Sequence, residues 1–165
     1  MSARPSIADK RKTFRKLHEA GCFVIPNPWN VGTARYLQSL GFKALATTSG
    51  GHAFSLGYPD GAQSRDVVLA HYREIAEAAD VPVNADFENG FADDPDGVAA
   101  NVTRCIATGV AGLSIEDSPK DDATPKSECI GTESGFKTEG KRIFYRWRSR
   151  TNARRSCAAR SSSTS

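Results

Sequence analysis

The sequence predicts an α/β fold in which short buried strands alternate with amphipathic helices. Short apolar runs recur every 20 to 30 residues between residues 22 and 116. Apolar and polar residues do not alternate within these runs, which is typical of parallel strands covered on both faces. Between the runs, apolar residues recur at helical spacing. This rhythm fits the βα units of a barrel and equally those of a doubly wound sheet.

The first elements are two helices with a strand between them. A helix over residues 6–20 begins at the N-cap residue Ser6 and ends before Gly21. The apolar run over residues 22–26 is the first predicted strand. A second helix is predicted over residues 30–40, where a glycine again follows the last helical residue.

The middle of the chain predicts two more strands around a third helix. The second strand covers residues 43–48, and a loop rich in glycine and serine follows over residues 49–63. Ser64 caps a helix that runs to residue 80, with apolar residues at helical spacing. The third strand covers residues 82–87.

The last regular elements are a helix and a fourth strand. The helix begins at Asp94 or Asp96 and ends at Gly109, and the strand covers residues 111–116. Polar and acidic residues follow the strands, at the edge where α/β proteins bind their ligands. We divide the chain into an N-terminal helix (1–20), a βα region (21–122) and an irregular tail (123–165).

The tail differs from the rest of the chain in charge and pattern. Residues 1–120 hold 12 Lys and Arg against 14 Asp and Glu, whereas residues 121–165 hold 10 against 5. The tail has no apolar periodicity. Three interpretations stay open: a disordered basic tail, an out-of-frame translation that begins near residue 122, and a nucleic-acid-binding segment.

Composition limits the class of protein. A chain of 165 residues can bury one core, but a complete eightfold α/β barrel typically needs about 250 residues. No apolar run reaches the roughly 18 residues of a membrane span, and the polar N-terminus shows no secretory signal. We therefore expect a cytoplasmic protein with no membrane partner. The four cysteines lack CxxC spacing, so neither zinc nor a disulfide framework is indicated; Cys22 and Cys105 are expected to be small buried residues.

Three acidic residues follow neighbouring strands. Asp86 ends the third strand and Glu88 lies two residues on, so an extended chain would point both carboxylates to the same side. Glu116 ends the next strand, which would lie roughly 4.8 Å away. Mg²⁺ suits such a site, because it takes one or two carboxylates and keeps several waters. The alternative is that these acids face solvent or cap the next helix.

A glycine-rich segment, Ser49-Gly50-Gly51, follows the second strand. Its backbone amides and the Ser49 hydroxyl could hold an anion such as a carboxylate or phosphonate. No GK[ST] sequence follows, so this is not a nucleotide-binding P-loop. His52 is interpreted as a spectator rather than an acid or base, and His71 as structural.

Together these segments resemble the isocitrate lyase / phosphoenolpyruvate mutase superfamily. The resemblance covers residues 10–118 and rests on the order and spacing of its motifs. These are Asn27-Pro-Trp-Asn30, Ser49-Gly-Gly51, Leu56-Gly-Tyr-Pro-Asp60, Asn84-Ala-Asp-Phe-Glu-Asn-Gly90 and Gly112-Leu-Ser-Ile-Glu-Asp117. It implies that residues 21–122 are a partial barrel domain. About four βα units would form the N-terminal half of a (β/α)₈ TIM barrel.

The resemblance also implies an active site. By position, the metal-binding acids are Asp86, Glu88 and Glu116, the substrate-binding residues Ser49, Gly50, Gly51 and Asp86, and the catalytic residues Asp60 and Glu116. The implied cofactor is Mg²⁺ and the implied substrate is a small 2-oxo or 2-hydroxy carboxylate, such as oxaloacetate, methylisocitrate or a phosphonate analogue. A C–C or P–C bond beside a carbonyl would be cleaved through an enolate that the metal stabilises. The complete enzyme is expected to be a homo-oligomer.

Two departures from the family pattern restrict this expectation. The segment after the fourth strand, Ser118 to Thr124, lacks the cysteine of isocitrate and methylisocitrate lyases. The metal motif reads Asp-Phe-Glu instead of Asp-x-Asp. The pattern is most similar to decarboxylase-like or methylisocitrate-lyase-like members, in a truncated or frame-shifted chain. An inactive half-barrel and a basic-tail nucleic-acid binder are the remaining alternatives.

Overall fold

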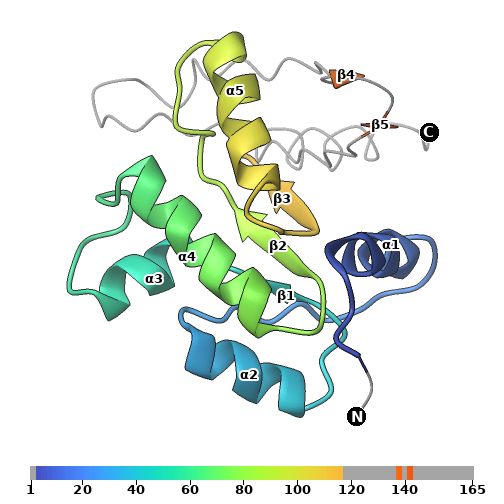
Figure 1. Cartoon of the computed structure of the whole chain (residues 1–165). Coiled ribbons are helices and arrows are strands. Elements are labelled where there is room, and N and C mark those ends of the chain that lie inside the picture. Colours follow the sequence, from blue (N-terminus) through green and yellow to red (C-terminus); the bar gives the residue numbers. More distant parts are fainter. Residues whose placement is uncertain (1–2, 117–136, 139–140, 143–165) are drawn as a thin grey trace, which may run out of the picture.

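The computed structural model describes residues 3–116, 137–138 and 141–142, and it has the α/β architecture that the sequence predicts (Figure 1). The helices are α1 (Ile7–Leu17), α2 (Val31–Ser39), α3 (Ser49–Ser55), α4 (Arg65–Ala78) and α5 (Pro95–Ile106). The strands are β1 (Leu45–Ala46), β2 (Val83–Asp86), β3 (Gly112–Ser114), β4 (Lys137–Thr138) and β5 (Lys141–Arg142).

Strands β1, β2 and β3 form a parallel sheet in that order. Leu45 pairs with Val83, and Asp86 pairs with Ser114, so β2 lies in the middle. The amide of Ala46 donates to the carbonyl of Pro26 at 3.0 Å. The prediction of a strand over residues 22–26 is wrong, because the sheet contains only β1, β2 and β3 among the described residues, although Pro26 lies beside β1.

Helix α4 links the two halves of the core. One cluster of buried residues gathers Val68 and Tyr72 of α4 with Phe87 and other residues around β2, β3 and α5. A second cluster gathers Ile75 of α4 with Leu45 and other residues of β1, β2 and α2. Because the apolar residues of α4 reach both clusters, this helix fixes the strand ends relative to one another.

Side-chain caps explain where the helices begin. Ser6 and Asp9 form a capping box at α1, and Asn30 and Thr33 form one at α2. Asp94 caps α5, where a proline occupies the first turn. These helices begin at or one residue after the predicted starts, and they end one to three residues before the predicted ends.

Three predictions need correction or fall outside the described residues. The predicted loop over residues 49–63 begins with a helix, α3, which Thr48 caps. Cys22 is exposed and not buried, whereas Cys105 is buried, and burial raises its thiol pKa to about 12. The predictions for residues 123–165 lie outside the described residues except for β4 and β5, which pair as an antiparallel ladder of two residues each.

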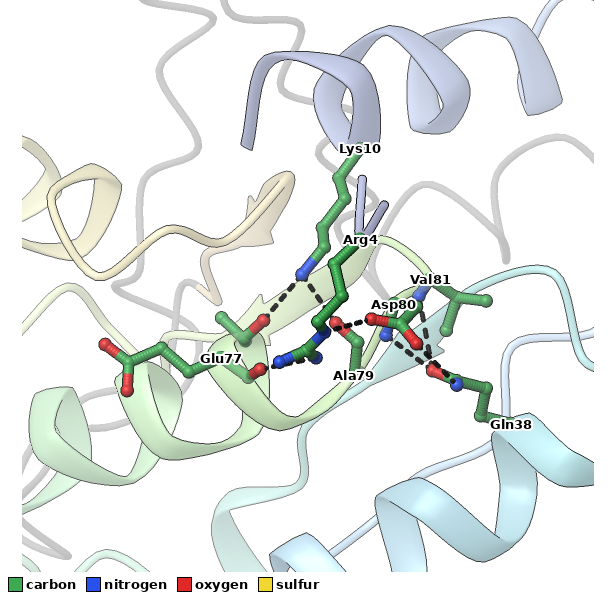
Figure 2. Close-up of polar contacts among 8 residues, drawn as sticks. Arg4, Lys10, Gln38, Glu77, Ala79, Asp80 and Val81 are labelled. Atoms are coloured by element: carbon green, nitrogen blue, oxygen red, sulfur yellow. Dashed lines mark hydrogen bonds and ion pairs between the residues drawn. The ribbon is translucent and has the colours of Figure 1, made fainter. Parts of the chain in front are cut away.

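Arg4 and Lys10 of the N-terminal region contact the carboxyl end of α4 (Figure 2). Lys10 is only 7% exposed, and its ammonium donates to the carbonyls of Ala76 and Ala79. Arg4 donates to the carbonyl of Glu77 and forms an ion pair with Asp80 at 2.6 Å. These cations satisfy carbonyls that a helix end leaves without partners and complement its dipole.

Helix α1 lies at the N-terminal ends of the strands. Arg11 donates to the carbonyls of Ile106 and Val110, just before β3. A Cβ atom at Gly112 would lie 2.5 Å from the ring of Phe14, so only glycine leaves room for that ring. The opposite, C-terminal edge of the sheet is left for the polar residues. No helix among the described residues is both long enough and apolar enough to cross a bilayer.

Candidate active site

The carboxyl ends of β1 and β2 bring the glycine-rich segment and Asp86 together. Asp86 is the last residue of β2, and its amide donates to the hydroxyl of Thr47, which follows β1. The amide of Ser49 in turn donates to Asp86 Oδ2 at 2.9 Å. This bond joins two segments that lie 37 residues apart in the chain, and both were predicted to bind substrate.

The glycine-rich segment forms the first turn of α3. Thr48 caps the helix, because its hydroxyl accepts a hydrogen bond from the Gly51 amide at 3.2 Å. A Cβ atom at Gly51 would lie 2.6 Å from Thr48 Cγ2. The Gly50 amide also belongs to this first turn, where a helix leaves amides without intrahelical partners.

Asp60 lies against the glycine-rich segment. A Cβ atom at Gly50 would lie 3.3 Å from the carboxyl carbon and from one carboxylate oxygen of Asp60. Asp60 is exposed, whereas Ser49, Gly50 and Gly51 are half-buried. The structure therefore brings the predicted catalytic residue Asp60 to the same place as the predicted substrate-binding residues.

Tyr72 of α4 fixes the end of β2 from the core side. Its hydroxyl donates to the backbone carbonyl of Asp86, and the side chain is only 1% exposed. Burial, followed by the nearby charge of Asp86, raises the pKa of this phenol far above its usual value. Tyr72 is therefore a neutral donor that holds the Asp86 backbone in place.

Glu88 and Glu116 do not join Asp86 in a cluster of three ligands. Within residues 3–116, 137–138 and 141–142, no group of three or more His, Cys, Asp or Glu residues could hold a metal ion. The prediction assumed an extended chain, but Glu88 has a φ of 45°, which turns the segment away from strand geometry. Its carbonyl accepts the Glu116 amide at 2.6 Å, and Glu116 is exposed.

Asp86 remains the best candidate ligand for a divalent cation. Its Oδ2 accepts the Ser49 amide, and no hydrogen bond to Oδ1 is found among the described residues. The side chain is half-buried. Mg²⁺ takes as few as one or two carboxylates and completes its shell with water and substrate oxygens. The donor set around Asp86 therefore fits Mg²⁺ without a cage of three acids.

A pair of histidines beside the site was missed as a functional feature. His52 of α3 and His71 of α4 stack with ring centroids 3.7 Å apart and ring planes 12° apart. The Nε2 atom of each is buried without a hydrogen-bond partner. His52 ends the glycine-rich motif and was interpreted as a spectator, but the sequence offers no signal for its pairing with His71, because the two residues lie on different elements.

Comparison with known proteins gives a family that spans most of the chain. The family described as phosphoenolpyruvate phosphomutase matches residues 14–138. These residues include every position assigned above to the candidate site. They also include β4, which the motifs of residues 10–118 did not cover.

Individual relatives agree with this family. The chain is 38% identical over 90 residues to the 2-methylisocitrate lyase of Escherichia coli K12, covering 53% of this chain and 30% of the lyase. A putative lyase/mutase from Burkholderia cenocepacia J2315 has a similar structure, with a TM-score of 0.67 and 50% identity. That match covers 68% of this chain and 41% of the other.

A further solved structure is oxaloacetate acetylhydrolase in complex with its product oxalate. The TM-score is 0.63 and the identity 31%, over 68% of this chain and 41% of that enzyme. The chain spans between 30% and 40% of the length of the curated relatives that it matches.

Proposed function

Because the chain belongs to the phosphoenolpyruvate phosphomutase family, and with it to the superfamily of isocitrate lyases and phosphoenolpyruvate mutases, we propose that it carries the carboxylate-binding side of a lyase or mutase site. The reaction is the cleavage of a C–C or P–C bond in a small 2-oxo or 2-hydroxy carboxylate. The observation that carries this proposal is the hydrogen bond from the Ser49 amide to Asp86 Oδ2.

The Ser49–Gly51 segment would hold the carboxylate of the substrate. The Ser49 hydroxyl and the Gly50 amide are the donors that this turn can offer, since the Gly51 amide is held by Thr48 and the Ser49 amide by Asp86. Donors fixed by the backbone are already oriented before the substrate arrives, which lowers the cost of organising the transition state.

Asp86 would be the ligand for Mg²⁺, with Glu88 and Glu116 as more distant acids that reach the ion through water. When bound, Mg²⁺ supplies Lewis-acid polarisation of the carbonyl beside the bond that breaks. The Ser49 amide orients Asp86 Oδ2, and Tyr72 holds the Asp86 backbone. These two contacts thus fix the orientation of the Asp86 carboxylate and its backbone.

Asp60 would move a proton at the substrate. Its exposed carboxylate lies against Gly50, beside the proposed position of the substrate carboxylate. A carboxylate that close to a bound substrate can act as general acid or base. We infer this role from position, and Glu116 remains a second candidate for it.

The names of the relatives support a proposal for the substrate class. Relatives and neighbours carry the names 2-methylisocitrate lyase, 2,3-dimethylmalate lyase, oxaloacetate acetylhydrolase and phosphonomutase. All four names fit small acids, so we propose oxaloacetate, 2-methylisocitrate or a phosphonate analogue as the substrate. The parallel strands β1, β2 and β3 would belong to the first half of a (β/α)₈ barrel whose complete form is a homo-oligomer.

Replacing Asp86 tests this function. The chain is assayed for turnover of oxaloacetate, 2-methylisocitrate and phosphonopyruvate with and without Mg²⁺. Asp86→Asn should lower kcat/KM on the accepted substrate by about a hundredfold or more, because a ligand and an oriented carboxylate are lost together. Asp93→Asn, which changes an exposed acid outside the site, is the matched control and should keep normal turnover. Turnover by Asp86→Asn equal to that of the control would overturn the proposal.

A further inference from the structure

The stacked histidines join the two elements that build the site. His52 follows Gly51 directly and lies on α3, whereas His71 lies on α4. The His71 ring is 6% exposed, and its face lies parallel to the ring of His52. Such a stack gives α3, a helix of only seven residues, a packed contact on the long helix α4.

The contact continues to Asp86 through aromatic rings. Tyr72 follows His71 in α4, and the two rings lie 6.1 Å apart between centroids. The Tyr72 hydroxyl donates to the carbonyl of Asp86, and its ring packs edge-on against Phe87. One turn of α4 therefore contacts both the helix that carries Gly50 and the strand that carries Asp86.

The surroundings of both rings favour the uncharged state. The Nε2 atom of His52 is buried without a hydrogen-bond partner, as is Nε2 of His71. A protonated imidazole carries an N–H at both nitrogens. Protonation would therefore bury an unpaired charged donor and place like charges on stacked rings, which is costly.

We propose that His52 and His71 are positioning residues that hold the Ser49–Gly51 segment against Asp86, and that they do so only while both rings are uncharged. The proposal rests on the proposed function for what the segment binds, but the contact itself does not depend on that function. In acid, protonation of either ring separates α3 from α4 and loosens the segment.

The charged groups around the pair set the direction of the pH effect. Burial lowers the pKa of His71 to about 4, and the charge of His52 adds to this. Burial also lowers the pKa of His52, while the Trp29 backbone and the charge of Glu74 on α4 raise it by smaller amounts. Both folded-state pKa values lie below the ordinary value of 6.5, so the contact is complete above pH 6.5 and weakens as the pH falls toward about 4.

The stack is not a two-histidine metal site. A metal ion bound to imidazole lies in the plane of the ring, along the nitrogen lone pair. With planes only 12° apart and centroids 3.7 Å apart, the two lone pairs lie in nearly parallel planes and do not converge on one point. A positioning contact is the role that this geometry supports.

Amide hydrogen exchange of the full chain tests the proposal between about pH 7.5 and about pH 5, with rates corrected for intrinsic exchange. In the wild type, protection of residues 49–56 should fall by up to about tenfold per pH unit for each proton taken up, while α5 serves as internal reference. His71→Phe keeps an aromatic ring that cannot be protonated, so its protection should fall less steeply with pH than in the wild type, because only His52 can then take up a proton. The matched control is His18→Phe at the residue that follows α1, which should keep the wild-type pH dependence.

Two results would overturn the proposal: α3 protection in the wild type that does not change with pH, or an unchanged pH dependence in His71→Phe. If His71→Phe does not fold, NMR titration of the wild-type imidazole protons decides instead. A His71 that titrates near 6.5 contradicts the proposal, and one that stays neutral to well below it supports the proposal. Oxalate binding in the presence of Mg²⁺, measured on the same samples, tests the proposed function separately, because the exchange experiment needs no ligand.

Discussion

At the scale of single residues, the site depends on two glycines that differ in what surrounds them. A side chain at Gly51 would meet Thr48 Cγ2 at 2.6 Å, and Thr48 cannot rotate away without losing its cap bond to the Gly51 amide. A side chain at Gly50 would meet the end of Asp60 at 3.3 Å, and Asp60 is exposed and free to shift. The absence of a side chain at Gly51 therefore matters for the stability of the fold. The absence of a side chain at Gly50 matters for the position of Asp60.

Substitution of these glycines by alanine should separate the two effects. Gly51→Ala should lower the free energy of unfolding by about 1–3 kcal/mol, from overpacking and loss of the cap. Gly50→Ala should lower it by less but should weaken substrate binding. Urea denaturation and KM, measured on both variants, check this. Equal losses of stability in the two variants would contradict the account of Gly51.

The residue scale is also where sequence reasoning reached its limit. It identified Ser49 and Asp86 because strand ends in α/β proteins meet at one edge, and it identified Asp60 only through the resemblance to the family; the structure brings the three together. It did not anticipate the turn at Glu88, since a positive φ is uncommon for glutamate and no glycine marks it. It also treated His52 as a spectator, because a contact between rings on separate elements leaves no local pattern.

At the scale of elements, caps and periodicity predicted most of the helices. Asn30 and Asp94 mark the starts of α2 and α5, and each makes the hydrogen bond expected of an N-cap. Helix α3 was missed, because serine and two glycines have low helix propensity and a turn is the better local interpretation. The cap at Thr48 and the packing on α4 override that propensity.

The contact between the N-terminal segment and α4 gives a prediction at this scale. Lys10→Met keeps the length of the side chain but leaves the carbonyls of Ala76 and Ala79 without their donor. The free energy of unfolding should fall by about 1–3 kcal/mol, the cost of burying unsatisfied polar groups.

Lys12→Met in the same helix is the matched control for this change. Lys12 is exposed, and no hydrogen bond of its side chain is found among the described residues. Its substitution should change stability by no more than about 0.5 kcal/mol. Thermal unfolding of the two variants side by side gives the comparison, and equal midpoints would refute the role of Lys10.

At the scale of the whole molecule, the contacts of α1 and the candidate site lie at opposite ends of the sheet. Helix α1 closes the end where the strands begin, through Lys10, Arg11 and Phe14. The polar groups of Thr48, Asp60 and Asp86 gather where β1 and β2 end. This division is typical of α/β barrels, in which loops at the carboxyl ends of strands carry the chemistry.

The central claim is that the Ser49–Gly51 segment and Asp86 together bind a carboxylate with Mg²⁺. The most direct measurement is amide NMR of the full chain titrated with oxalate in the presence of Mg²⁺. Saturable shifts should centre on the amides of residues 49–51, 60 and 86, and they should disappear in Asp86→Asn. Shifts centred elsewhere, such as on the N-terminal segment around Arg4, or none up to about millimolar oxalate, would contradict the claim.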